Sequence, residues 1–457
     1  MKAFLTWFLL GAVALGINFA GDVGRAETSR FRLATFECDV TPPPDGHPLI
    51  WVTPVKTVET PLLARGVVLD DGQNRYVLCA VDWCGLCNSS YDLFRQKIAD
   101  GADTSVSRVA VQCVHPHTAP YTDGDAQRLL QKFEDLPLYV DFEFLEEVTD
   151  RLAAEVQQSL DRLEPFDRVG TGQAKVDRVA SSRRIITPDG KFHGRSSSTK
   201  DPRLRALPEG HIDPYLKTIT LARGDRPLVR LHYYATHPQS FYGDPRACSD
   251  VPGFARGRLE EEEGVFQIYF NGCGGDVAMG KYNDRTPRAR SELTDRLYEG
   301  MKASAASTRY APVERLQWRT TELRLPPRTD KGYTLEENRA RMADPKQNVV
   351  RRVRAATRVA FTERLSAGKT LPLSCLEIGN LSVLHLPGEC LVDFQLFAQD
   401  AAPDRFVAVA AYGDLGPGYI CTKKAFAEGG YEPSASRAGP ESEPALKEAI
   451  RRLLAEE

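Results

Sequence analysis

Short apolar runs with the pattern of β-strands alternate with helical patterns along most of the chain. Strand-like runs include ARGVVLDD, RVAVQCVH, PLVRLHYYATH and VFQIYFNG, and helical patterns such as FLEEVTDRLAAEVQQSL and SELTDRLYEGMKASAAS lie between several of them. Strands that alternate with helices favour an α/β fold, because each helix covers the sheet that its neighbouring strands build. We therefore predict an α/β fold with mixed β-sheets flanked by helices.

The composition is that of a soluble globular protein with a distinctive start. The 457 residues are 42% hydrophobic and 26% charged, and a net charge of −3 provides no basic field for nucleic acid. Residues 3–16 are apolar, follow Lys2 and precede small residues up to Ala26, a pattern typical of secretory signal peptides. We predict a signal peptide over residues 1–26, cleavage after Ala26, and an exported, periplasmic or extracellular protein with at most peripheral membrane contact. An uncleaved anchor is the alternative.

We predict that residues 27–457 form one domain. They contain no internal sequence repeat. The stretch from about 326 to 370 is charged and mostly helical in pattern, which indicates an insertion or cap. We interpret two basic runs, VVRRVRAATR and SSRRIITPDGKFHGR, as solvated helix and loop faces. Several of the ten cysteines lie in strand-like runs, where buried thiols are common, and Cys84 and Cys87 form a lone CxxC that indicates a local disulfide or chance spacing. Nothing in the pattern indicates an oligomeric state.

Residue types that can bind a metal or act in catalysis follow several of the strand-like runs. RVAVQCV is followed by His115 and His117, LVRLHYYAT by His237, LSVLHLPG by Glu389, and VAVAAYGDLGPG by Tyr419. Because α/β proteins bind ligands in the crevice beyond the strand ends, we predict the active site there. If the strand of residues 109–114 stays extended through residue 117, both histidines leave the same face.

Two histidines and one carboxylate from separate strands are the usual ligands of a catalytic zinc, which keeps a position for water. The metal lowers the pKa of that water to roughly 7 and polarises the carbonyl under attack. Taken singly, His237 also suits a packed core position, Glu389 a helix start, where it complements the dipole, and Tyr419 a packed aromatic surface. A different chemistry is a thiolate nucleophile at Cys273 in NGCGGD, which is otherwise a turn cysteine.

The sequence resembles the neutral, non-lysosomal ceramidases, exported zinc amidases that cleave the N-acyl bond of ceramide. The resemblance extends from ATFECDVTPPPDGHP near residue 34, through LLARGVVLDDG and VLCAVDWCG, to GGYEPSAS near residue 430. The segments HPHTAP, YATHPQSF, LPGE and GYICT match the ligand segments of the family. The resemblance implies a Zn2+ site with these ligands: His115, His237, Glu389 and Tyr419.

The resemblance also implies three catalytic residues. They are His117 beside the first ligand, Tyr431 in GGYEP, and Arg183 in VASSRRI, with Arg184 as the alternative arginine. It implies that zinc-activated water attacks an amide carbonyl, while His117, Arg183 and Tyr431 donate hydrogen bonds to the oxyanion. The expected substrate is ceramide or a related N-acyl lipid.

The sequence departs from the family pattern at three points. Ala278 in GGDVAMGKYN stands where the family has a serine, which excludes a serine nucleophile at that position. Pro116 separates the two histidines, and 26 residues follow Tyr431, so we do not expect the immunoglobulin-like domain that follows in the family. A zinc mechanism needs no serine. A non-catalytic zinc protein that binds lipid or glycan is the alternative function.

Overall fold

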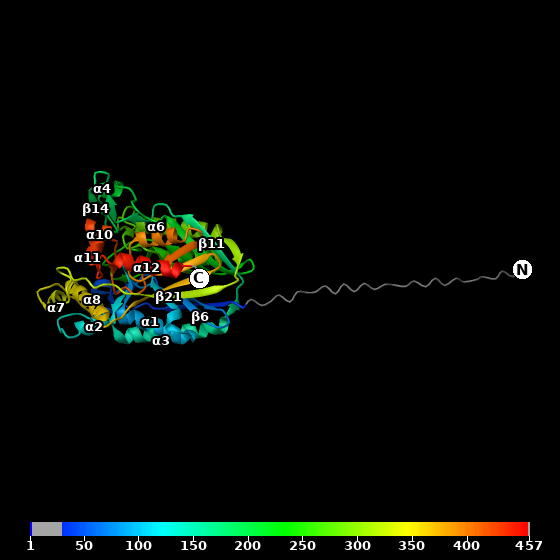
Figure 1. The fold of residues 1–457 in the computed structure, drawn as a ribbon, viewed down its shortest axis with the longest axis horizontal. Coiled ribbons are helices and arrows are strands. Elements are labelled where there is room, and N and C mark those ends of the chain that lie inside the picture. Colours follow the sequence, from blue (N-terminus) through cyan, green and yellow to red (C-terminus); the bar gives the residue numbers. More distant parts are fainter. Residues whose placement is uncertain (2–29, 456–457) are drawn as a thin grey trace.

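The computed structural model, drawn in Figure 1, contains three large mixed β-sheets among the described residues. The structure describes Met1 and residues 30–455, so the predicted signal peptide lies, except for Met1, outside the described residues. Within this part of the chain, every helix is too short or too polar to cross a membrane. The sheets and their flanking helices confirm the predicted α/β fold.

The first sheet has the strand order β10-β1-β5-β6-β8. Its strands are β1 (Arg32–Asp39), β5 (Leu63–Asp70), β6 (Arg75–Val81), β8 (Val109–Cys113) and β10 (Glu164–Pro165). Strands β6 and β8 are parallel, whereas the other neighbours are antiparallel. Helices α1 (Asn88–Ala102) and α3 (Phe142–Ser159) pack together and cover one face of this sheet.

The second and third sheets are built in the same way. The second has the order β18-β16-β15-β11-β20, with β11 (Arg168–Lys175), β15 (Tyr215–Arg223), β16 (Arg226–Tyr234), β18 (Phe266–Asn271) and β20 (Arg309–Pro312), next to helices α5 (Asp250–Glu263) and α6 (Pro287–Ala306). The third has the order β21-β22-β23-β25, with β21 (Leu316–Leu323), β22 (Leu371–Ile378), β23 (Leu381–His385) and β25 (Phe406–Ala410), next to helices α9 (Val392–Ala401) and α12 (Ser442–Leu454).

Each large sheet contains the same unit, an antiparallel strand pair followed by a helix and a strand parallel to the second of the pair. Within residues 63–410 these units are β5-β6-α1-β8, β15-β16-α5-β18 and β22-β23-α9-β25. A parallel pair needs such a crossover, and it brings the carboxyl ends of both strands to one edge of the sheet. The architecture therefore repeats although the sequence shows no repeat.

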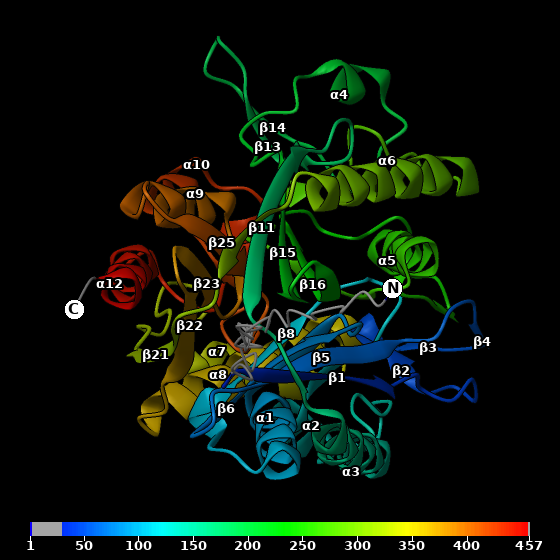
Figure 2. The ribbon, with the colours of Figure 1, turned by 90° about the vertical axis from the view of Figure 1, so that its right-hand side faces the viewer.

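The inner faces of the three sheets bury apolar side chains from alternate positions, which share one face of a strand. Examples are Val67 and Leu69 of β5, Ile219 and Leu221 of β15, and Leu376 and Ile378 of β22. Figure 2 shows the sheets around this core, with α1 and α3, α5 and α6, and α9 and α12 on the outside. The common core fixes the three parallel edges relative to one another.

Two helices form within the predicted insertion, α7 (Leu335–Ala343) and α8 (Val349–Ser366). Helix α8 packs against α7, α1, α2 (Gly124–Leu130) and the turn η1 (Ile50–Val52). In Figure 1 this helical pair lies at the same end of the molecule as α11 (Tyr431–Ala435) and β14 (Phe192–Gly194).

The remaining elements are short. The strands are β2 (Pro48–Leu49), β3 (Thr53–Pro54), β4 (Thr57–Val58), β7 (Gly85–Cys87), β9 (Tyr121–Asp123), β12 (Ser181–Ser182), β13 (Arg184–Ile186), β17 (Arg246–Ala247), β19 (Val277–Ala278), β24 (Glu389–Cys390) and β26 (Tyr419–Ile420). The helices are η2 (Val106–Arg108), η3 (Leu160–Arg162), α4 (Pro202–Ala206) and α10 (Lys423–Glu428). Several of the two-residue strands pair where the strands of the large sheets end.

All ten cysteines lie among the described residues, and all are buried and free. The local disulfide considered for Cys84 and Cys87 is therefore not formed. Burial raises the pKa of both thiols well above the ordinary value, so they are neutral core groups.

Candidate metal centre

His115 lies just beyond β8, but the strand does not extend through it. Its backbone φ is +75°, in the left-handed region that non-glycine residues seldom adopt, so the condition that the strand stays extended through residue 117 is not met. Two contacts hold this bend: the His115 N–H donates to the Trp83 carbonyl at 3.0 Å, and Nδ1 donates to the Cys84 carbonyl at 2.5 Å. The unprotonated Nε2 of the imidazole is left to face the other predicted ligands.

His237 follows β16 and is held by the glycine-rich loop after β18. Its N–H donates to the Val277 carbonyl at 2.8 Å, and Nδ1 donates to the Gly274 carbonyl at 2.6 Å. The side chain is fully buried. Because Nδ1 carries the proton, Nε2 again presents a lone pair.

Glu389 and Tyr419 come from the paired strands β24 and β26. They are direct partners in this parallel ladder, so both side chains leave the same face. The Glu389 Oε2 lies 3.1 Å from Nε2 of His237 and 3.4 Å from Nε2 of His115. The Tyr419 hydroxyl lies 3.4 Å from the same His237 nitrogen. The structure thus brings all four predicted ligands together.

The charges of these groups are arranged for a cation. Burial alone would raise the pKa of Glu389, but the imidazoles of His115 and His237 lower it well below its ordinary value. Burial lowers the pKa of His237, which favours the neutral ring. The lowering of the Glu389 pKa needs positive charge beside the carboxylate, whereas neutral imidazoles turn Nε2 lone pairs toward it, and the buried Nε2 of His115 has no hydrogen-bond partner among the described residues. A cation between these atoms would turn that repulsion into attraction.

His117 lies beside the ligand group. Its ring centroid is 4.7 Å from that of His115 and 5.6 Å from that of His237. Burial, together with the two neighbouring imidazoles, lowers the pKa of His117 well below its ordinary value. Its Nδ1 donates to the His115 carbonyl at 3.2 Å, so the neutral ring keeps a free lone pair on Nε2.

Of the two adjacent arginines, Arg183 faces the metal centre. Its guanidinium donates to the Tyr419 hydroxyl at 3.2 Å and pairs with the Glu432 carboxylate at 3.1 Å. The alternative, Arg184, instead donates to the Gly429 carbonyl and binds the far oxygen of Glu432, which fixes the chain around α11. This places Arg183, and not Arg184, among the active-site candidates.

Tyr431 begins α11 at the cavity wall. Its side chain is 44% exposed, its ring centroid lies 5.7 Å from that of Tyr419, and the Arg183 guanidinium stacks over it at 5.0 Å. Tyr431 can therefore reach a ligand from the solvent side of the same group. All seven residues predicted for the site lie around one cavity or directly beneath it.

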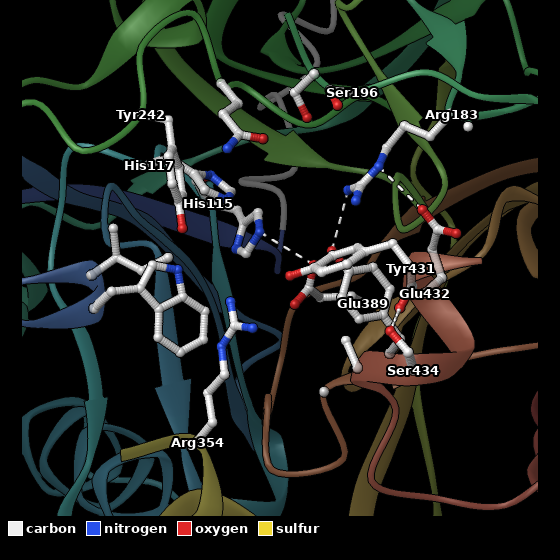
Figure 3. Close-up of a pocket in the computed structure, with 18 of the residues that line it drawn as sticks. His115, His117, Arg183, Ser196, Tyr242, Arg354, Glu389, Tyr431, Glu432 and Ser434 are labelled. Carbon is white, nitrogen blue, oxygen red and sulfur yellow. Dashed lines mark hydrogen bonds and ion pairs between the residues drawn. The ribbon is translucent and has the colours of Figure 1, made fainter. Parts of the chain in front are cut away.

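The cavity has a volume of about 630 Å³ and opens above the ligand group (Figure 3). Its wall includes residues that sequence reasoning missed: Trp51, Ser196, Tyr242, Arg354, Arg358 and Glu432. The arginine pair had a visible signal, since positions 354 and 358 are four apart and therefore share one helix face. The two basic runs are not solvated throughout: Arg184 and Arg195 are buried, and Arg354 and Arg358 face the cavity.

Tyr412 was missed as well. It is buried with a φ of +63°, and its hydroxyl lies 3.4 Å from Nδ1 of His237 while its ring packs 4.5 Å from that of His115. It therefore supports both imidazoles from below. Cys273, the alternative nucleophile, is fully buried away from the cavity wall, and burial raises its pKa well above the ordinary value, which argues against a thiolate there.

Asp276 in the glycine-rich loop gives a stability prediction. It accepts the Val392 N–H at the start of α9 at 2.9 Å, and burial raises its pKa from 3.8 to about 7. The folded state therefore holds this proton more tightly than the unfolded chain, and stability falls as pH rises from about 4 to about 7. Because each pKa unit corresponds to about 1.4 kcal/mol, the loss amounts to roughly 4 kcal/mol at most.

The Asp276→Asn variant keeps a side-chain oxygen that can accept the Val392 N–H, but its amide group does not titrate. We expect the variant to gain stability relative to wild type as the pH rises through this window, measured by urea unfolding at pH 5 and pH 8. A stability difference between the two proteins that is the same at both pH values would contradict the assignment.

The comparisons with known proteins concern the fold. No protein-family model matches the sequence, and a search of curated proteins gives no match. The structure of the neutral ceramidase from Pseudomonas aeruginosa has a TM-score of 0.68 at 15% identity, covering 93% of this chain and 74% of that one. A ceramidase complexed with C2 has a TM-score of 0.68 at 14% identity, with the same coverage. At these identities the likeness is one of fold.

Proposed function

We propose that this protein is a zinc-dependent amide hydrolase that cleaves the N-acyl bond of ceramide or a related lipid amide. The observation that carries the proposal is the convergence of His115, His237 and Glu389, whose ligand atoms lie within 4.8 Å of one another. The fold shared with proteins named as ceramidases favours amide cleavage among the reactions open to such a centre.

The donor set suits zinc. Imidazole nitrogens and a carboxylate are typical of catalytic zinc sites, and His115, His237, Glu389 and Tyr419 would hold the ion. The carbonyls that accept from both Nδ1 atoms fix the imidazoles in the tautomer that a metal requires. Cys84 also lies near His115, but its Sγ lies 3.7 Å from Nδ1, the nitrogen that donates to the Cys84 carbonyl, and so on the other side of the ring from the Nε2 that faces Glu389. When bound, zinc supplies the Lewis acidity that polarises an amide carbonyl and acidifies water.

His117 is assigned the proton transfer. Because its Nδ1 donates to a backbone carbonyl, its Nε2 can accept a proton from the attacking water and return it to the leaving amine. The neutral imidazole has no second N–H to offer, but once Nε2 has accepted the proton its N–H can also serve as the oxyanion donor expected from the sequence.

Arg183 and Tyr431 are assigned to the developing oxyanion. Burial opposes the charge of Arg183, but Tyr419 and Glu432 raise its pKa, so the guanidinium stays protonated. Donors aimed at a developing charge in a water-excluded site usually make the largest contribution to catalysis. Tyr431 adds a hydroxyl from the exposed side.

We also propose that residues 1–26 direct export and that residues 27–457 form one hydrolase domain capped by α7 and α8. Lipid amides outside the cytoplasm would then be within reach. At most peripheral contact with a membrane is required, because the cavity opens to the surface.

Metal removal tests the function. We expect the purified protein to contain zinc, to hydrolyse a fluorescent ceramide or another N-acyl lipid, to lose that activity on treatment with a chelator, and to regain it with added zinc. Iodoacetamide should have little effect, because all the cysteines are buried. Activity that survives complete metal removal would refute the zinc mechanism, and inactivation by iodoacetamide would favour the thiol hydrolase. Bound zinc without turnover of any N-acyl lipid would favour the non-catalytic binding protein.

A further inference from the structure

Helix α8 presents an arginine-rich face to the cavity. Arg354, Thr357 and Arg358 occupy positions i, i+3 and i+4, so they share one side of the helix, and all three line the cavity. Elsewhere on the same helix, the buried Arg352 pairs with Asp135. Two like charges four residues apart on a helix repel each other, so this face is costly unless something offsets its charge.

Arg354 lacks an anionic partner. Its guanidinium stacks over the Trp51 indole at 4.2 Å, and among residues 30–455 it forms no ion pair and no side-chain hydrogen bond. Its Nε is buried without a partner. Trp51 is held there by a backbone with a φ of +57°. In Figure 3 the Arg354 side chain rises from α8 into the cavity, toward His115 and Glu389.

Arg358 is similar. It donates to the Ser434 carbonyl at 3.2 Å and lies 4.8 Å from the centroid of the Tyr333 ring, but no carboxylate of the described chain lies within 4.0 Å of it. Burial, together with the positive charges of Arg437, Arg341 and Arg354, lowers the pKa of Arg358 to about 10. Both features indicate a surplus of positive charge at this wall.

The whole cavity has the same surplus. Among the described residues that line it, two are carboxylates, Glu389 and Glu432, and both are engaged, Glu389 in the ligand group and Glu432 with Arg183 and Arg184. The cationic residues of the lining are Arg183, Arg195, Arg285, Arg354, Arg358 and Arg437. A neutral lipid amide offers nothing that matches this charge, whereas an anionic group would form charge-assisted hydrogen bonds with it.

We propose that the substrate of this site is an amide that carries an anionic group, which Arg354 and Arg358 bind while the amide lies at the metal centre. This inference rests on the proposed function and narrows its substrate class from ceramide, which carries no anionic group, to related lipid amides that do. Carboxylate and phosphate share the required chemistry, because the planar donor fork of arginine matches both. The α7–α8 cap thereby acts as the element that selects the substrate.

Matched pairs of substrates test the inference. The first pair is N-octanoylglycine and the neutral N-octanoylglycinamide, and the second is N-octanoyl-O-phosphoethanolamine and the neutral N-octanoylethanolamine. For wild type we expect kcat/KM to favour the anionic member of at least one pair by roughly 10- to 100-fold, as hydrogen bonds to charged groups allow. The pair with the larger ratio distinguishes carboxylate from phosphate.

Variants of α8 test whether its arginines cause the preference for anionic substrates. The double variant Arg354→Gln/Arg358→Gln should bring the ratio close to one, whereas Arg351→Gln, an exposed position on the same helix, should leave it as in wild type. Because each ratio is measured within one enzyme, a partial loss of stability does not affect it. If the double variant does not fold, the single variant Arg354→Gln gives the same comparison.

Binding measurements distinguish a failure of this inference from a failure of the proposed function. If no amide is hydrolysed, calorimetric titration with N-octanoylglycine and N-octanoyl-O-phosphoethanolamine decides. Binding of either by wild type that is lost in the double variant would support the anion site while hydrolysis fails. Absence of binding for both, or a wild-type ratio near one for both substrate pairs, would overturn the inference.

Discussion

Replacing His237 with alanine is expected to abolish zinc binding and amide hydrolysis together. The Nε2 of His237 lies 3.1 Å from the Glu389 carboxylate and 3.4 Å from the Tyr419 hydroxyl, so its loss removes the central member of the ligand group. Changes in groups that merely orient a ligand already cost roughly 10- to 100-fold in metal affinity or activity. We expect a larger effect here, with zinc content after dialysis and kcat/KM both near background.

A matched control separates metal loss from damage to the core. His232 lies on the same strand as the residues that lead to His237 and is equally buried, but its imidazole bonds to Thr218 and Gln267, away from the cavity. His232→Ala should lower the melting temperature and keep zinc. Added zinc should raise the melting temperature of wild type and of this control, but not that of His237→Ala. Zinc retention with normal turnover in His237→Ala would refute the site.

The part of the site that could be predicted from the sequence consists mainly of residues that follow the ends of strands. His115 and His237 follow β8 and β16, and Glu389 lies just beyond β23. Each of these strands belongs to a parallel pair, and the common core brings the three parallel edges together, so residues far apart in sequence meet. The alternation of strands and helices predicted this class of fold, but not that its units repeat, because the repeat lies in hydrogen-bond topology and not in residue identity.

The conformation of His115 could not be predicted. An apolar run that ends in HPH reads as a continuing strand, yet the bend depends on carbonyls of Trp83 and Cys84, which follow a different strand. The position of the α8 arginines at the cavity wall could not be predicted for a related reason. Their spacing shows that they share a face, but only the packing of α8 against α2 and η1 decides that this face lines a cavity and not solvent.

Arg183 is placed to act on the transition state without holding the metal. Its guanidinium reaches the Tyr419 hydroxyl at 3.2 Å and lies over the Tyr431 ring, while Glu432 fixes its orientation. If Arg183 is removed, Glu432 keeps an ion pair with Arg184, so the carboxylate is not left alone in the interior. The fold should therefore tolerate the change better than it tolerates the loss of an isolated buried pair.

Arg183→Met is accordingly expected to keep zinc and to lower kcat by about 10²- to 10³-fold, the effect of losing one donor to an oxyanion. The measurement is zinc content, KM and kcat of the variant and of wild type. Added guanidinium should restore part of kcat in Arg183→Met and none in His237→Ala, because only the first variant keeps the metal centre beside the vacated space. Loss of zinc from Arg183→Met would contradict this assignment and make Arg183 a support of the ligand group, and unchanged turnover would remove it from the mechanism.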